Sequence, residues 1–275
     1  MSIDPSSARP GAIPQRLEFA ALGRTFARRR TGSDRATHVV LDDVSLVVAP
    51  NEVVAILGSS GCGKSTLLRI AAGLDTPTSG SVRIGGVAVN GIDPRCSIAF
   101  QEPRLLPWRS LAGNVALGLP RGTDRSDGVA AVDALLALVG LASFASHRPR
   151  EVSGGMAQRT SLARALARGP SVLLLDEPFG ALDALTRLRM QDLLLDVHAA
   201  APTTVLLVTH DVDEALQLAD RVVLLGPDQD REGASIRRIV AVPGNRPRDR
   251  GSAELAELRA GLLAGLGIDR HAGLH

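Results

Sequence analysis

The sequence predicts an α/β fold in which a small antiparallel β subdomain precedes a mostly parallel sheet, with a helical subdomain inserted. Short runs of branched apolar residues, such as Val53–Leu57, Val172–Leu175 and Thr204–Val208, have the continuous hydrophobicity of strands buried on both faces. These runs alternate with helical patterns, as in sheets built from right-handed parallel crossovers. Strand runs vanish between residues 102 and 153, where we expect the helical subdomain.

The N-terminal part of the chain predicts the antiparallel subdomain. Residues 1–16 are rich in Pro, Ser and Ala and show no periodicity, so we expect a disordered tail. An arginine-rich segment, residues 24–35, is interpreted as a solvated loop, and Asn51 as a turn residue able to adopt the left-handed conformation. The strands expected here cover residues 17–22, 39–48, 82–84 and 87–89, the last two joined by the hairpin signal Gly85-Gly86.

The remaining elements follow from the same alternation. We expect further strands over residues 53–57, 97–100, 172–175, 204–208, 221–225 and 236–240. We expect helices from residue 65 to about 72 and over residues 155–168, 184–199, 211–219 and 253–266. Residues 17–245 are therefore interpreted as one domain, and residues 246–275 as a C-terminal helical extension.

The composition excludes several classes of function. Basic residues number 31 and acidic residues 29, so the formal net charge is +2, and five Phe, one Trp and no Tyr leave few rings for stacking bases. Nucleic-acid binding is therefore not expected. Two cysteines are too few for a disulfide framework, which favours a reduced, cytosolic compartment. We find no secretory signal at the N-terminus and no run of about 18 apolar residues that could span a membrane.

The strongest motif follows the strand at 53–57. Residues 58–65 match the pattern G-x-x-x-x-G-K-[ST], whose glycines let backbone N–H groups point at phosphate oxygens, and the next helix would add its positive end. Lys64 is the only lysine of the chain, and its compact ammonium suits this loop better than a guanidinium. Ser65 could ligate Mg²⁺. The candidate phosphate-binding residues are Gly58, Ser59, Ser60, Gly61, Cys62, Gly63, Lys64, Ser65 and Thr66.

Two carboxylates end the apolar strand at 172–175. Asp176 stands where a Mg²⁺ partner is needed, and Glu177 where a base could polarise water for in-line attack on a γ-phosphate. Acidic residues end many strands at protein surfaces, so this pair gains its meaning from the phosphate loop. The segment Ser153-Gly154-Gly155 opens a helix and would permit close approach of an anion, although on its own a plain capped helix start explains it better.

Taken together, these features resemble the ATPase subunits of ABC transporters. Residues 58–66 resemble the Walker A motif, residues 152–159 the ABC signature and residues 173–178 the Walker B motif. Gln101, Asp183 and His210, each unremarkable alone, resemble the Q-loop glutamine, the D-loop aspartate and the switch histidine. The resemblance covers roughly residues 17–245 and implies a P-loop NTPase (RecA-like) core.

The resemblance also implies a role for each of these residues. ATP would bind with Mg²⁺, and Phe26 would stack on adenine in place of the more common Tyr. Glu177 would polarise water, and His210 would contact the γ-phosphate. The implied metal ligands are Ser65, Gln101 and Asp176. Two departures from the family pattern, Asn51 in place of Gly and Val152 in place of Leu, remove no catalytic atom.

Partners are implied in the same way. Two copies should pair head to tail, so that each ATP lies between Lys64 of one copy and Ser153-Gly154-Gly155 of the other, with Asp183 in the cofactor-binding set. The helical subdomain should dock a membrane permease at the cytoplasmic face of the membrane, and the permease in turn would meet a solute-binding protein. Candidates for that docking groove are Leu105, Leu106 and Trp108, for which an ordinary core position is the alternative.

A closer resemblance concerns the transported solute. Residues 100–108 and 176–183 are similar to those of nitrate, sulfonate and taurine importers, and we expect no room after residue 245 for the additional β-domain of sugar or polyamine importers. Aliphatic sulfonates are the first expectation, with taurine and nitrate or bicarbonate as alternatives. A soluble ABC ATPase of translation or DNA repair would need a second cassette or a coiled-coil insert, and a P-loop kinase leaves the signature and His210 unexplained.

Overall fold

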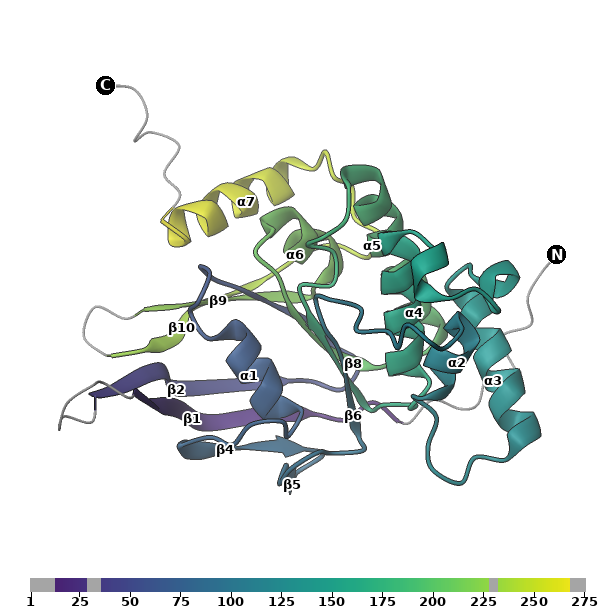
Figure 1. Cartoon of the computed structure of the whole chain (residues 1–275). Helices are drawn as coiled ribbons and strands as arrows, with labels where there is room; N and C mark the ends of the chain where they lie inside the picture. Colours follow the sequence, from purple (N-terminus) through teal and green to yellow (C-terminus); the bar gives the residue numbers. More distant parts are fainter. Residues whose placement is uncertain (1–12, 29–35, 228–231, 268–275) are drawn as a thin grey trace.

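The chain folds around one twisted mixed sheet with helices on both sides (Figure 1). The computed structural model describes residues 13–28, 36–227 and 232–267. Over these residues the sheet has 10 strands in the order β5-β4-β1-β2-β10-β9-β3-β8-β7-β6. The strands are β1 (Leu17–Arg28), β2 (Ala36–Val48), β3 (Val53–Leu57), β4 (Ser79–Ile84), β5 (Val87–Ala88), β6 (Cys96–Ala99), β7 (Val172–Asp176), β8 (Thr204–Val208), β9 (Arg221–Pro227) and β10 (Ala234–Ala241).

The helices connect these strands as the alternation predicts. They are α1 (Lys64–Ala71), α2 (Leu111–Ala116), α3 (Arg125–Leu138), α4 (Gly154–Leu166), α5 (Ala184–Ala200), α6 (Val212–Leu218) and α7 (Ala253–Gly265), with short 3-10 turns at Ala142–Phe144 and Pro149–Glu151. β9, β3, β8, β7 and β6 pair in parallel, in that order. This places the carboxyl ends of all five strands at one edge, where ligands bind in open parallel sheets.

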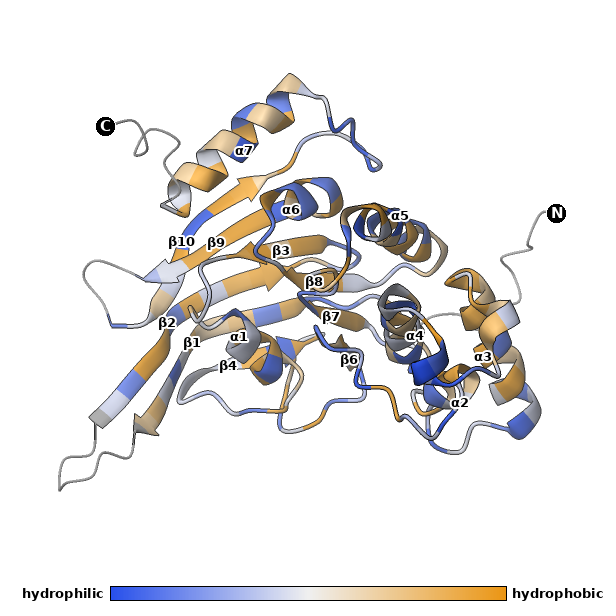
Figure 2. Cartoon of the chain, turned by 45° about the horizontal axis from the view of Figure 1, so that its top comes forward, coloured by the Kyte–Doolittle hydropathy of each residue, from blue (hydrophilic) through white to orange (hydrophobic). Residues whose placement is uncertain are grey.

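Residues of the parallel strands alternate between two hydrophobic clusters. Val54 and Ile56 of β3 face α1, β1, β2 and β4. Val53 and Ala55 face the opposite cluster, which includes side chains from α4, α5, α6 and α7. Both faces of β3, β7 and β8 are therefore covered, and Figure 2 shows these strands mostly in the hydrophobic colour. This double burial explains why their sequences are continuous apolar runs.

The antiparallel subdomain differs from the expectation at one segment. β1 continues through residues 24–28, which were interpreted as loop, because these residues pair with the start of β2: Thr25 lies opposite Val39 and Phe26 opposite His38. Pairing with a neighbouring strand overrides the high arginine content of this stretch. Two local predictions are confirmed: Asn51 has φ 63°, and Gly85 and Gly86 form the positive-φ turn between β4 and β5.

Residues 102–153 carry α2, α3 and both 3-10 turns, as expected for the inserted subdomain. A separate hydrophobic cluster holds them together, and Ala163 and Ala167 at the end of α4 belong to it. α4 therefore joins this subdomain to the parallel core, since Leu162 and Ala165 of the same helix pack in the core cluster.

Several expectations fall on residues outside the described ranges. Most of the expected tail, residues 1–12, lies outside them, as do residues 29–35 of the arginine-rich segment and residues 268–275 of the C-terminal extension. Residues 13–16 are described, and the Gln15 carbonyl accepts a hydrogen bond of 2.7 Å from Thr204 Oγ1. No helix within the described ranges is long and apolar enough to cross a membrane.

Candidate active site

The loop between β3 and α1 has the backbone that its motif requires. A Cβ atom on Gly58 would lie 2.4 Å from the Leu225 carbonyl oxygen, so only glycine fits there. Gly63 has φ 101°, a conformation that side chains rarely adopt, and it directly precedes the first residue of α1. Lys64 is 5% exposed, and its Nζ donates hydrogen bonds of 2.7 Å and 2.9 Å to the carbonyls of Gly58 and Ser59. The loop is thus curled around its own ammonium group.

A hydroxyl and a carboxylate meet beside this loop. Ser65, in the first turn of α1, donates from Oγ to Asp176 Oδ1 at 2.9 Å. Asp176 is the last residue of β7 and is 8% exposed. Burial raises the pKa of this carboxyl, and the hydrogen bond from Ser65 opposes that rise. The buried carboxylate at the end of β7 and the hydroxyl from α1 are oxygen ligands of the kind that a hard cation such as Mg²⁺ prefers.

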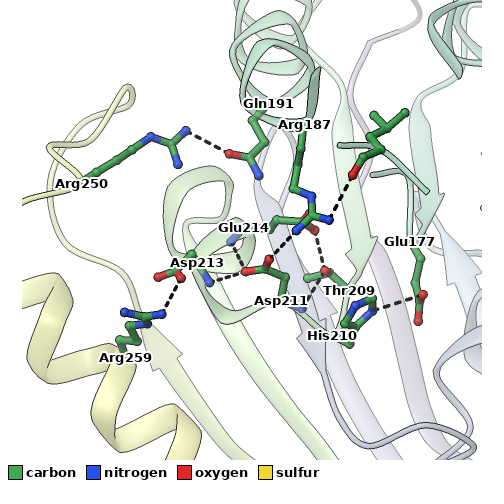
Figure 3. Close-up of polar contacts among 11 residues, drawn as sticks. Glu177, Arg187, Gln191, Thr209, His210, Asp211, Asp213, Glu214, Arg250 and Arg259 are labelled. Atoms are coloured by element: carbon green, nitrogen blue, oxygen red, sulfur yellow. Dashed lines mark hydrogen bonds and ion pairs between the residues drawn. The ribbon is translucent and has the colours of Figure 1, made fainter. Parts of the chain in front are cut away.

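Glu177 lies at the centre of a second group of polar side chains. Its φ of 46° is unusual for a residue other than glycine, and its N–H donates to the Val208 carbonyl at 2.9 Å, which ties the turn after β7 to the end of β8. Glu177 Oε2 accepts a 3.2 Å hydrogen bond from Gln101 Nε2. The same oxygen lies 3.2 Å from His210 Nδ1 (Figure 3). Gln101 and His210, each more than 30 positions away from Glu177 in the sequence, thus converge on one of its carboxylate oxygens.

The signature segment has its own contacts, on the helical side of the molecule. Ser153 accepts a 3.3 Å hydrogen bond from the Met156 N–H and so caps α4, and Gly154 leaves open space where a Cβ would stand. A Cβ on Gly155 would come 2.6 Å from Thr186 Cγ2 of α5. Asp183 caps α5 by accepting from the Thr186 N–H at 3.0 Å. Within the described part of the chain, the hydrogen bonds of Ser153 and Asp183 do not reach the 58–66 loop.

Phe26 lies on β1 with its ring partly exposed. The Arg24 guanidinium stacks over this ring at 4.2 Å from its centre. Arg24 also forms a two-pronged ion pair with Asp75, with N–O distances of 2.7 Å and 3.2 Å. Because Asp75 follows α1 closely, Arg24 links the ring to the helix of the phosphate loop. The sequence analysis missed Arg24, since its role depends on the strand pairing of residues 24–28.

The segment after Gln101 is held by buried polar groups that sequence reasoning also missed. Asn114 is fully buried; its Oδ1 accepts from the Leu106 N–H at 2.7 Å, and its Nδ2 donates to the carbonyls of Leu106, Arg109 and Ser110. This arrangement fixes the loop in which Trp108 is 68% exposed. Leu105, in contrast, packs against the helical cluster. Of the three groove candidates, Trp108 has the exposed position and Leu105 has a core contact.

The residues present fit a nucleoside triphosphate with Mg²⁺. The loop supplies a buried ammonium and a helix N-terminus for phosphate groups. Among the described residues there is no cluster of three or more His, Cys, Asp or Glu that could hold a metal ion. Ser65 and Asp176 would hold Mg²⁺ together with phosphate oxygens, and the third predicted ligand, Gln101, lies beside Glu177. Mg²⁺ is commonly held in this way, by one or two carboxylates, water and substrate phosphates.

This fold and this site define a P-loop nucleotide-binding protein. The family described as ABC transporter matches residues 41–180. The aliphatic sulfonates import ATP-binding protein SsuB 2 of Burkholderia lata is 54% identical over 225 residues, which cover 82% of this chain and 80% of that protein. SsuB 2 of Burkholderia cenocepacia is 47% identical over 267 residues, covering 96% of this chain and 92% of that protein. The chain therefore belongs to the ABC transporter family, as its motifs indicate.

The fold agrees with a solved member of that family. The dimeric, post-hydrolysis structure of the ATP-binding cassette MJ0796 bound to ADP and Pi is similar with a TM-score of 0.70 and 30% sequence identity, covering 83% of this chain and 100% of that chain. The predicted fold class, a P-loop core with an antiparallel β subdomain and an inserted helical subdomain, is confirmed.

Proposed function

We propose that this chain is the ATP-hydrolysing subunit of an ABC importer for aliphatic sulfonates. The observation that carries the proposal is the convergence of Gln101 and His210 on Glu177, next to the Ser65–Asp176 pair and the buried Lys64. This set supplies a base, a metal partner and a phosphate-binding cation at one edge of the sheet. The names of its relatives, aliphatic sulfonates import ATP-binding proteins, support the choice of solute.

The proposed reaction assigns a task to each group. Backbone N–H groups of residues 58–66 and Lys64 bind the phosphates, Ser65 and Asp176 hold Mg²⁺, and Phe26 stacks on adenine. The metal, when bound, neutralises developing phosphate charge. Glu177 orients a water molecule and accepts its proton as the water oxygen attacks the γ-phosphorus. The bond from that phosphorus to the β–γ bridging oxygen breaks, and ADP leaves with this oxygen. His210 donates a hydrogen bond toward the transferred phosphoryl group, and Gln101 adds a metal or water contact.

The proposed assembly is a head-to-tail pair of copies bound to a permease. The open Cβ space at Gly154 and the capped N-terminus of α4 support a role for Ser153-Gly154-Gly155 in contacting the phosphates held by the other copy. Trp108, exposed in a loop fixed by Asn114, supports contact between the helical subdomain and a permease at the cytoplasmic face of the membrane. A solute-binding protein would contact the permease and not this chain.

Growth and uptake measurements test the proposal. In the source organism, deletion of the gene should abolish growth with ethanesulfonate as sole sulfur source and leave growth on sulfate unchanged. The unsubstituted gene should restore growth and uptake of labelled ethanesulfonate, whereas the Glu177→Gln gene should not. Restoration by Glu177→Gln would contradict the catalytic assignment. Loss of taurine or nitrate uptake, with ethanesulfonate uptake intact, would favour the alternative solutes.

A further inference from the structure

We propose that Arg187 is a positioning residue for ATP hydrolysis: from α5 it holds the loop that places His210 beside Glu177, and it ties that loop to the segment before Asp183. This inference rests on the proposed function. Arg187 belongs to none of the sequence motifs described above. Figure 3 shows its guanidinium beside the carboxylates of Asp211 and Glu214.

The side chain of His210 needs support from its neighbours. It is 61% exposed, so packing contributes little to its orientation, and its contact with Glu177 is a single 3.2 Å approach. The residues on either side are far better fixed. Thr209 is 1% exposed and its N–H donates to the Ile56 carbonyl of β3 at 3.2 Å, while Asp211 caps α6. The position of His210 is therefore set by the backbone that Thr209 and Asp211 hold.

Glu214 connects these two flanking residues. The Thr209 hydroxyl accepts from the Asp211 N–H at 3.0 Å and donates to Glu214 Oε2 at 2.6 Å. Asp211 Oδ1 in turn accepts from the N–H groups of Asp213 and Glu214 at 2.8 Å and 3.1 Å. Glu214 is 3% exposed, whereas the Asp211 side chain is 26% exposed. The hydrogen-bonded ring thus places one buried and one partly exposed carboxyl group close together at the start of α6.

Arg187 faces both carboxylates. Its Nη1 lies 3.2 Å from Asp211 Oδ2, and its Nε, a buried atom with no hydrogen-bond partner among the described residues, lies 3.7 Å from Glu214 Oε1. Its Nη2 donates to the Leu182 carbonyl at 3.3 Å, immediately before Asp183. A planar guanidinium reaches these three groups at once, which a lysine ammonium could not do with the same geometry.

Removal of this cation would leave the Asp211 and Glu214 carboxyl groups without the guanidinium that contacts both of them. Burial is the main cause of the raised pKa of Glu214; the Asp211 charge raises it further, and Arg187 opposes the rise. Without Arg187 the ring of hydrogen bonds would adjust, and the backbone at Thr209 and Asp211 would move. A displacement of about 1 Å in a catalytic group can lower a rate by about a hundredfold.

The first experiment compares Arg187→Ala with Arg189→Ala in the full-length chain. Arg189 is an exposed arginine two residues further along α5, so it controls for the loss of charge and side chain on that helix. We expect Arg187→Ala to lower kcat about ten- to a hundredfold, while KM for MgATP and the affinity for a fluorescent ATP analogue stay within about twofold. Arg189→Ala should keep the normal kcat. Arg187→Lys, which retains the charge, should recover part of the rate.

A double-mutant cycle with His210→Ala separates positioning from general stability. In single-turnover reactions with labelled ATP, Arg187→Ala should cost little when His210 is already absent, because the residue acts through that side chain. The same fold loss in both backgrounds would overturn the inference, as would a normal kcat in Arg187→Ala or a parallel loss in Arg189→Ala. If Arg187→Ala does not fold, a normal kcat in Arg187→Lys overturns it. Absence of hydrolysis by the unsubstituted chain would overturn the proposed function itself.

Discussion

Lys64 shows how one residue connects sequence, burial and chemistry. The chain uses arginine at every other basic position, and at position 64 the structure surrounds the ammonium with the carbonyls of Gly58 and Ser59. The Lys64 ammonium is compact and carries three N–H donors, so it fits inside this loop. A guanidinium is planar and wider and would fit less well. The residue is thus recognisable from the sequence, and its geometry explains the choice of lysine.

We predict that Lys64→Arg weakens binding of MgATP by about ten- to a hundredfold, the equivalent of one lost hydrogen bond to a charged group. The charge is kept, so the loss would arise from shape. Titration with a fluorescent ATP analogue measures it. Arg69→Lys, the reverse exchange at an exposed position of α1, is the matched control and should bind normally. Equal affinities for Lys64→Arg and the unsubstituted chain would contradict the phosphate-binding assignment.

The buried carboxyl of Glu214 predicts a pH-dependent stability. Burial raises its pKa from 4.5 to about 7. Below pH 4.5 the carboxyl is protonated in both states, so it adds no difference. Between pH 4.5 and 7 the unfolded chain releases a proton that the folded chain keeps, so the free energy of unfolding falls as the pH rises, and the penalty is complete above pH 7.

Glu214→Gln removes this titration. Thermal unfolding at several pH values should therefore show the variant gaining stability relative to the unsubstituted chain from pH 5 to pH 8, by at most on the order of 3 kcal/mol. Any cost of the substitution that does not depend on pH lowers the stability of the variant by the same amount at every pH. A difference between the two proteins that does not change with pH would contradict the assignment of a buried, proton-binding carboxyl.

At the scale of elements, α7 is attached to the core in two ways. Leu255 and Leu262 are buried in the cluster that includes α6 and the parallel strands. Arg259 of α7 forms a 2.9 Å ion pair with Asp213 of α6, and both side chains are about half exposed. Apolar burial is expected to dominate, because exposed ion pairs contribute at most about 1 kcal/mol.

We predict that Leu262→Ala lowers the free energy of unfolding by about 2–4 kcal/mol, because it leaves a cavity beneath α7. Arg259→Ala should lower it by less than about 1 kcal/mol. Denaturant titration of both variants measures the two values. Comparable losses would mean that the ion pair contributes as much as the apolar contact, which would contradict the prediction.

Elements whose burial leaves a local hydrophobic pattern could be predicted from the sequence. An element that forms only because it pairs with a distant strand could not. The strand at 172–175 and the capping of α4 by Ser153 follow from local pattern, and the structure has both. The strand over residues 24–28 follows from its pairing with β2, which no local pattern contains. The same holds at the site: motifs located Lys64 and Glu177, whereas Arg187 and Asn114 act through contacts between distant segments.

At the scale of the whole molecule, the proposed site is divided between two copies. Lys64 and the signature residues Ser153-Gly154-Gly155 belong to separate elements, α1 and α4, and α4 packs against α2, α3, α5 and β6. If each reaction needs both parts from different copies, the ATPase rate should rise faster than linearly with protein concentration where the dimer dissociates. Steady-state rates over a dilution series measure this. Strict proportionality through the dissociation range would contradict shared sites.

We propose that Glu177 acts as the base for hydrolysis of ATP that is held between two copies of the chain. Glu177→Gln keeps the shape of the side chain and removes its ability to accept a proton. The direct measurement is size-exclusion chromatography of this variant with MgATP, followed by analysis of the bound nucleotide. We predict a dimer that retains uncleaved ATP, while the same variant without nucleotide remains a monomer. A monomer in saturating MgATP, or conversion to ADP at the rate of the unsubstituted chain, would contradict this role of Glu177.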